Sequence, residues 1–184
     1  VVKGDFPGGL KDLDTTRQDV TDKLIEVFSY WMENFNIDGF RIDTLKHVEH
    51  SFWQQFCPAI RAKAKELGKH NFLMFGEAFD GDDHLLGDFT HNEEVDSVFY
   101  FSQKFRVFDG VFKWGGPTSD IETLYLERRQ METEDFQGNP LPSPRPRYGG
   151  TPHIDGIGVA PQDVLVNFID NHDLPRFLNE KNDP

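Results

Sequence analysis

The chain has 184 residues, of which 37% are hydrophobic, 28% charged and 14% aromatic, an ordinary composition for a globular protein. Its formal net charge of −13 argues against nucleic acids and anionic membranes as partners, because both are bound through basic patches. The single cysteine, Cys57, excludes a disulfide within the chain, and no apolar run approaches the roughly 20 residues of a membrane span.

The first part of the chain predicts a helix, a strand and a second helix. Apolar residues at helical spacing indicate a helix over 20–35 with Thr16 as its N-terminal cap. The apolar run 37–43 (IDGFRID) predicts a short buried strand. A second helix is expected over 52–67, with Pro58 in the first turn of its main part.

The rest of the chain continues this alternation. The runs 71–77 (NFLMFGE), 96–101 (DSVFYF) and 164–173 (VLVNFIDNHD) predict three further strands. Between them, polar residues 80–92 indicate a rim loop with at most a short helix, and a capping-box spacing predicts a helix over 119–129. Short apolar strands that alternate with helices are typical of a parallel α/β barrel.

Residues 136–162 interrupt the alternation. This segment is dense in Pro and Gly, cannot continue a helix and shows no periodicity. A solvated loop is the first interpretation. A lip over a binding groove, formed with Tyr148 and Arg147, is the second.

Three of the predicted strands end in a carboxylate: Asp43, Glu77 and Asp173. In parallel barrels the catalytic groups lie at the C-terminal ends of the strands, so these acids are expected at one rim. Alternation along the strand places Arg41 on the same face as Asp43, and alone the two could form a purely structural ion pair. Two more carboxylates at strand ends favour a site.

Four segments resemble, in order, signature regions of the alpha-amylase family of glycoside hydrolases. They are LKDLDTT at 10–16, GFRIDTLKHV at 39–48, GEAF at 76–79 and FIDNHD at 168–173, with Lys11 where proline is usual. The neighbouring DGDD and NHDLPRF stretches make the chain most similar to fungal-type and related bacterial alpha-amylases. The resemblance covers nearly the whole chain except the Pro/Gly-rich segment.

The resemblance implies an α/β fold that is part of a TIM (β/α)8 barrel, about strands 4 to 7. The family's first signature, a DxxxNH pattern, does not occur, so the chain is expected to be an internal piece of the catalytic barrel. Residues 1–14 would be the tail of the inserted domain B, and 136–162 an inserted loop. A partial barrel leaves unpaired strand edges, so the isolated chain is expected to fold poorly and to be inactive.

The resemblance further implies retaining hydrolysis of α-1,4-glucosidic bonds in starch or related α-glucans. Asp43 would be the nucleophile and Glu77 the general acid/base, about 5–5.5 Å apart. Arg41 would keep Asp43 ionised, and burial beside an apolar strand would favour protonated Glu77. Asp173 would hold two sugar hydroxyls, and His172 would donate to a hydroxyl of the same sugar.

Three other basic residues are candidates for substrate contact, together with Arg41 and His172. Lys46 and His47 form the KH pair that lines the aglycone side of the cleft in alpha-amylases, although both could merely cap a strand-to-helix turn. Arg176 could reach substrate or brace its own loop.

Ion binding is implied only by the resemblance. Calcium in this family is bound by positions that match Asp12 and the backbone carbonyl of His47, and the remaining ligands would lie upstream. Arg41 and Asn171 match two possible chloride ligands, and whether chloride binds stays undecided.

Several alternatives stay open. The same chemistry could serve an alpha-glucan transglycosylase or a maltodextrin-acting glucosidase. A non-catalytic barrel relative could act in binding or assembly, and an unrelated barrel could use the three carboxylates and His172 to bind a metal. The resemblance implies a monomer when full-length, secreted or periplasmic, with starch or maltooligosaccharides as substrate.

Overall fold

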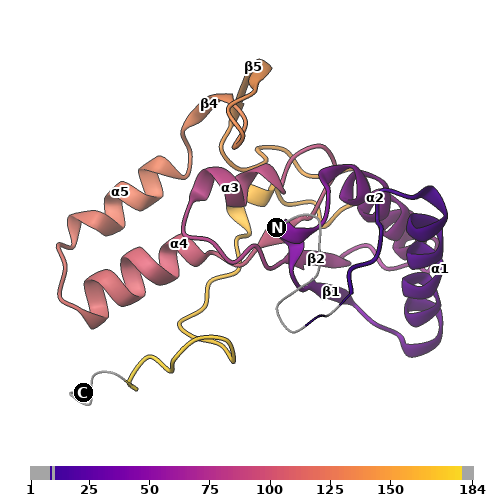
Figure 1. Cartoon of the computed structure of the whole chain (residues 1–184), viewed down its shortest axis with the longest axis horizontal. Coiled ribbons are helices and arrows are strands. Elements are labelled where there is room, and N and C mark those ends of the chain that lie inside the picture. The colour runs from indigo at the N-terminus through magenta and orange to yellow at the C-terminus, as the bar shows by residue number, and fades with distance from the viewer. Residues whose placement is uncertain (1–8, 10, 180–184) are drawn as a thin grey trace.

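The computed structural model describes residue 9 and residues 11–179, and it is an α/β structure built around a short parallel sheet (Figure 1). α1 and α2 lie at one end of the sheet, the helical segments α4, η2 and α5 lie at the other, and the β4–β5 hairpin projects between them (Figure 1). The elements in chain order are α1 (Gln18–Phe35), β1 (Gly39–Ile42), η1 (Leu45–His47), α2 (His50–Glu66), β2 (Leu73–Gly76), α3 (Asp83–Asp88), β3 (Ser97–Val98), α4 (Phe101–Gln103), η2 (Lys104–Lys113, a π-helix), α5 (Ser119–Glu127), β4 (Met131–Glu134), β5 (Pro140–Pro146) and η3 (Pro161–Asp163).

The predicted parallel sheet is confirmed. Its strand order is β1-β2-β3, and the register pairs Ile42 with Gly76 and Gly76 with Val98. Because all three strands run in the same direction, their carboxyl ends meet at one edge, as a barrel-type α/β fold requires.

The strand predicted over 164–173 does not form. The segment nevertheless runs beside the residues that follow β3, where a neighbouring parallel strand would lie. Only an isolated parallel bridge joins Phe99 to Val166, where the Val166 N–H donates to the Val98 carbonyl at 3.0 Å. The pairing goes no further because Phe101 already begins α4 and leaves the following residues without a neighbouring strand. The expected strand over 96–101 is shortened to Ser97–Val98 for the same reason.

The hydrophobic core lies between the sheet and the first two helices and continues to the other end of the sheet through Phe101 and Leu124. Met74 is fully buried, and Phe40 packs edge to face against Phe28 of α1 and Phe72 at ring distances of 5.3 and 5.0 Å. Each buried apolar side chain of this size contributes about 1.5–3 kcal/mol, so the core holds α1 and α2 against the outer face of the sheet.

The helix ends differ in detail from the prediction. Thr16 does not cap α1: its hydroxyl donates to Asp14, and Arg17 stands at the cap position without a side-chain cap. Pro58 lies inside α2 and not in a first turn. The helix continues through it because Cys57 and Ile60 on either side are fully buried, and this packing outweighs the lost backbone hydrogen bond.

The remaining helical segments agree with the prediction only in part. The helix predicted over 119–129 is confirmed as α5 but ends at Glu127, and its N-terminus has no side-chain cap. The helical segment over Phe101–Lys113 was not predicted. The rim loop over 80–92 contains the single short helix α3, as expected.

The segment 136–162 is not a featureless loop, because its first part folds back as strand β5 against β4. β5 carries Pro at every second position, and alternate N–H groups of an edge strand point away from the partner strand, so the pairing survives. Asp135 closes the turn by accepting from the Asn139 N–H at 2.8 Å, and Gly138 takes the left-handed conformation with φ +81°.

The interpretation of Tyr148 as part of a lip over a binding groove is wrong. Its side chain is fully buried, and its hydroxyl donates to Asp83 at 2.8 Å. The domain division at 1–14 stays a prediction, and residues 1–8 and 10 lie outside the described residues.

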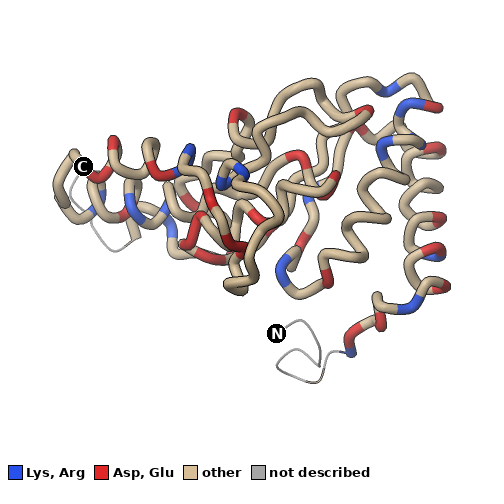
Figure 2. Tube along the Cα trace, turned by 90° about the horizontal axis from the view of Figure 1, so that it is seen from above, with Lys and Arg blue, Asp and Glu red and all other residues tan. Residues whose placement is uncertain are grey.

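Acidic residues occur in every region of the described chain (Figure 2), consistent with its negative net charge. Within the described residues, no helix is long and apolar enough to cross a membrane.

Candidate active site

Asp43 and Glu77 stand opposite each other at the ends of neighbouring parallel strands. The register that pairs Ile42 with Gly76 continues one residue further, because the Glu77 N–H donates to the Ile42 carbonyl at 2.8 Å. In the next hydrogen bond along this pair of strands, the Leu45 N–H donates to the Glu77 carbonyl at 2.8 Å. Backbone pairing therefore sets the spacing of the two carboxylates.

Arg41 links the two carboxylates. Its Nη1 lies 2.6 Å from Asp43 Oδ1, and its Nη2 lies 3.2 Å from Glu77 Oε1. The guanidinium also lies 5.7 Å from the ring centre of Phe99 on β3's side of the sheet. The structural ion pair considered for Arg41 and Asp43 is thus present, and it includes Glu77.

The two carboxylates have different surroundings. The Asp43 side chain is 63% exposed and the Glu77 side chain 9%. Burial raises the pKa of Glu77 above its usual value, the neighbouring Asp43 raises it further, and Arg41 partly offsets both effects. Glu77 is therefore the carboxyl that favours the protonated form.

A strained backbone follows Asp43. Thr44 takes the left-handed conformation with φ +53°, which is rare for a β-branched residue. The reversal leads into η1, so Lys46 can donate to the Phe79 carbonyl and lie 3.2 Å from Asp80 Oδ2. Strain of this kind is often found at functional sites.

Asp173 and His172 contact each other at 3.1 Å and are both exposed. Among the described residues, no hydrogen bond or ion pair joins Asp173 to Asp43 or Glu77. The meeting of all three acids stays a prediction.

Arg176 braces its own loop in this structure, which is one of its two predicted roles. Its Nη1 forms an ion pair with Asp170, whose other oxygen accepts from the Phe177 N–H at 3.0 Å. The two hydrogen bonds lower the pKa of Asp170.

The two predicted calcium positions do not make a metal site by themselves. Asp12 lies on a cavity of about 470 Å³ that it shares with Arg41 and Asp43, and His47 lies in η1. Calcium needs six to eight oxygen ligands. In the part of the chain that the structure describes, no cluster of three or more His, Cys, Asp or Glu side chains could hold a metal ion.

The residues that sequence reasoning missed lie beside Lys46. His50, Asp88 and Phe136 line a neighbouring cavity of about 440 Å³. Asp88 and Phe136 come from segments that the sequence predicted to be loops, so no periodicity marked them.

The chain is similar to alpha-amylases and related enzymes. The family model for the alpha-amylase catalytic domain matches residues 5–115. The chain is 41% identical over 98 residues to an alpha-amylase of Streptomyces lividans, covering 53% of this chain and 11% of that protein. It is 38% identical over 176 residues to a cyclomaltodextrinase of Geobacillus thermopakistaniensis, covering 94% of this chain and 24% of that protein.

Solved structures show the same fold. The alpha-amylase of Anoxybacillus superposes with a TM-score of 0.66 at 22% identity, over 95% of this chain and 32% of that one. An alpha-amylase from Malbranchea cinnamomea gives 0.63 at 23% identity, over 95% and 29%. The chain therefore spans about a third or less of the length of these proteins.

Proposed function

The chain belongs to the alpha-amylase family of glycoside hydrolases, and we propose that it supplies the catalytic carboxylates for retaining hydrolysis of α-1,4-glucosidic bonds in starch or related α-glucans. The observation that carries this proposal is the pair Asp43 and Glu77 at adjacent strand ends, one exposed and one buried, joined by Arg41. Adjacent parallel strands lie about 4.8 Å apart, which suits the short carboxyl separation of retaining enzymes.

The proposed reaction has two steps. Protonated Glu77 donates its proton to the glycosidic oxygen while an Asp43 oxygen attacks the anomeric carbon, so the leaving chain departs with a new hydroxyl. Ionised Glu77 then takes a proton from water, and the water oxygen displaces Asp43 from the sugar. Both carboxyls return to their starting protonation states.

Arg41 and Asp173 would support these steps. Arg41 contacts both Asp43 and Glu77, so the two carboxyls are held in position before substrate arrives. Asp173, following the family resemblance, would hold two hydroxyls of the sugar ring as positive charge develops on it.

A related specificity is the second candidate. Relatives that match 94% or more of this chain include a cyclomaltodextrinase and, at 34% identity, a maltogenic alpha-amylase of Bacillus acidopullulyticus. Action on maltodextrins, or transfer to another sugar, would use the same two carboxylates. A purely binding role is disfavoured because all three family carboxylates are present.

The chain spans only 24% of the cyclomaltodextrinase, so we propose that the 184 residues work within a longer catalytic domain. We also propose that the complete protein is a secreted or periplasmic monomer. Residues outside this segment would supply the remaining ligands of its calcium site. Chloride binding at Arg41 and Asn171 stays open.

The experiment that tests the function is digestion of soluble starch by the complete protein, followed by proton NMR of the first products. We expect α-anomers to appear before mutarotation, because two displacements retain configuration. First products in the β-configuration would contradict the assignment of Asp43 as nucleophile. The isolated segment 1–184 is expected to release no reducing sugar, and release by that segment would contradict its proposed incompleteness.

A second prediction concerns pH. Arg41 lowers the pKa of Glu77, so Arg41→Ala should raise that pKa further. Because Glu77 must be protonated to act as the acid, the alkaline limb of kcat/KM should move to higher pH, whatever the loss in maximum rate. Arg41→Lys keeps the positive charge and is the matched control, with a limb closer to that of the parent. An alkaline limb that stays in place in Arg41→Ala would show that another group sets it.

A further inference from the structure

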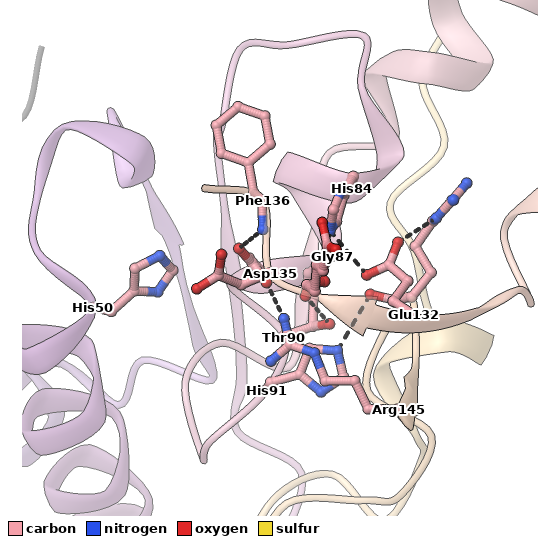
Figure 3. Close-up of polar contacts among 12 residues, drawn as sticks. His50, His84, Gly87, Thr90, His91, Glu132, Asp135, Phe136 and Arg145 are labelled. Carbon is pink, nitrogen blue, oxygen red and sulfur yellow. Dashed lines mark hydrogen bonds and ion pairs between the residues drawn. The ribbon is translucent and has the colours of Figure 1, made fainter. Parts of the chain in front are cut away.

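A cleft separates the β4–β5 hairpin from the beginning of α2 (Figure 3). It consists of two cavities of about 440 and 250 Å³ that share His50, Asp88 and Gln137 as lining residues. We call this space the hairpin cleft. The larger cavity falls within the range of about 300–1,000 Å³ that is common for small-molecule sites.

The hairpin wall of the cleft is held firmly in place. Asp88 accepts from the backbone N–H of Phe136 at 2.9 Å, and its second oxygen pairs with Arg145 of β5. Glu132 of β4 accepts from Nε of Arg147, the residue that follows β5, at 2.6 Å, and lies 3.3 Å from His84 of α3. The Phe136 backbone is therefore positioned before any ligand arrives.

The opposite wall is equally ordered. The ring of His50 stacks on Phe89 with centroids 4.4 Å apart, and its Nδ1 lies 2.9 Å from Glu94 Oε2. Glu94 is fully buried and also accepts from Gln54 Nε2 at 2.9 Å. Figure 3 shows His50 facing the hairpin across the cleft, with Phe136 and Asp135 on the other side.

The cleft combines apolar surface with balanced charge. Phe136 is 41% exposed and lines the larger cavity together with Val48 and Leu85. The basic residues around the two cavities are matched in number by acidic ones. They are Lys46, His50 and Arg145 against Glu49, Asp88 and Asp135. This balance disfavours a charged ligand, whereas an aromatic ring with nearby donors and acceptors suits the apolar face and hydroxyl edge of a neutral sugar.

The cleft adjoins the candidate active site through Lys46. This residue lies three positions after Asp43 and lines the larger cavity. Its amino group contacts the Phe79 carbonyl and Asp80, in the loop that directly follows Glu77. The cleft thus begins where the loops after both carboxylates meet.

We infer that the hairpin cleft binds the part of the α-glucan chain on the leaving-group side of the scissile bond, with the Phe136 ring stacked on a glucosyl unit. This inference rests on the proposed function. It assigns a specificity role to Phe136, in a hairpin that none of the signature segments contains. The number of glucosyl units on the leaving-group side would then contribute to substrate selection.

The test compares Phe136→Ala in the complete protein with Phe112→Ala, a matched loss of an exposed ring on η2. Loss of the stacked ring should raise KM for maltoheptaose about tenfold, because the apolar face of the glucosyl unit is no longer covered. With an aryl α-maltotrioside, which has no glucosyl unit on the leaving side, kcat/KM should stay within about twofold of the parent. Phe112→Ala should change neither value.

A binding measurement separates failure of this inference from failure of the proposed function. Calorimetric titration of maltoheptaose into Glu77→Gln protein, with and without Phe136→Ala, should show the same tenfold loss of affinity without turnover. Equal affinity in both proteins, or an equal loss with the aryl maltotrioside, would overturn the role of Phe136. Phe136-dependent binding by a protein that hydrolyses no α-glucan would overturn the proposed function and leave the cleft as a glucan-binding site.

Discussion

The complete protein carrying Glu77→Gln should hydrolyse starch about 10²–10⁴-fold more slowly than the parent, the range usual for loss of a general acid/base. Glutamine has nearly the same shape but cannot donate the proton to the leaving oxygen. Folding should not suffer, because Glu77 lies in a buried place that favours its neutral form.

Two comparisons make this expectation specific. An aryl glycoside with a good leaving group does not need protonation, so its glycosylation step should lose much less rate than starch hydrolysis does. Glu122→Gln, on the exposed side of α5, is the matched control and should leave activity unchanged. An equal loss of rate for starch and for glycosylation by the aryl glycoside would show that Glu77 is not the acid.

Asp43→Asn should abolish turnover of both substrates, because no leaving group can replace the attacking carboxylate. The loss should therefore be at least as large as that of Glu77→Gln on starch, and it should persist with the aryl glycoside. The control is Asp22→Asn. It makes the same change of charge, but at an exposed carboxylate on α1.

The same variant has a second readout that does not depend on activity. Asp43 raises the pKa of Glu77, so its neutralisation should lower that pKa and let Glu77 ionise at lower pH. Carboxyl titration by NMR or infrared spectroscopy measures this directly. A Glu77 pKa that stays unchanged in Asp43→Asn would contradict the coupling of the two side chains.

The pairing of Asp43 with Glu77 was predictable from the sequence, because two short apolar runs end in an acid at the same point. A strand is set largely by its own apolar and β-branched residues, and parallel neighbours bring their ends to one edge. Arg41 beside Asp43 followed from alternation on one strand. Its contact with Glu77 did not, because the rotamer of a long side chain depends on what the next strand presents.

Other elements could not be predicted from the sequence, because they too depend on contacts with distant segments. The run 164–173 has the composition of a strand, but a strand needs a partner, and the neighbouring chain turns into α4 after Phe99. The four prolines of β5 indicated a loop, yet pairing with β4 on one edge makes a strand of them. Pro58 was expected in the first turn of the main part of a helix, but it lies inside α2, and the buried residues around it keep the helix continuous.

Local patterns in the sequence thus decided the family, the parallel strands and the two carboxylates at their ends, since these depend on residues close together in the chain. The tertiary structure alone decided that Arg41 joins both carboxyls and that a hairpin anchored by Asp88 stands across from His50. Burial and contacts of this kind arise from segments far apart in sequence, and no single segment encodes them.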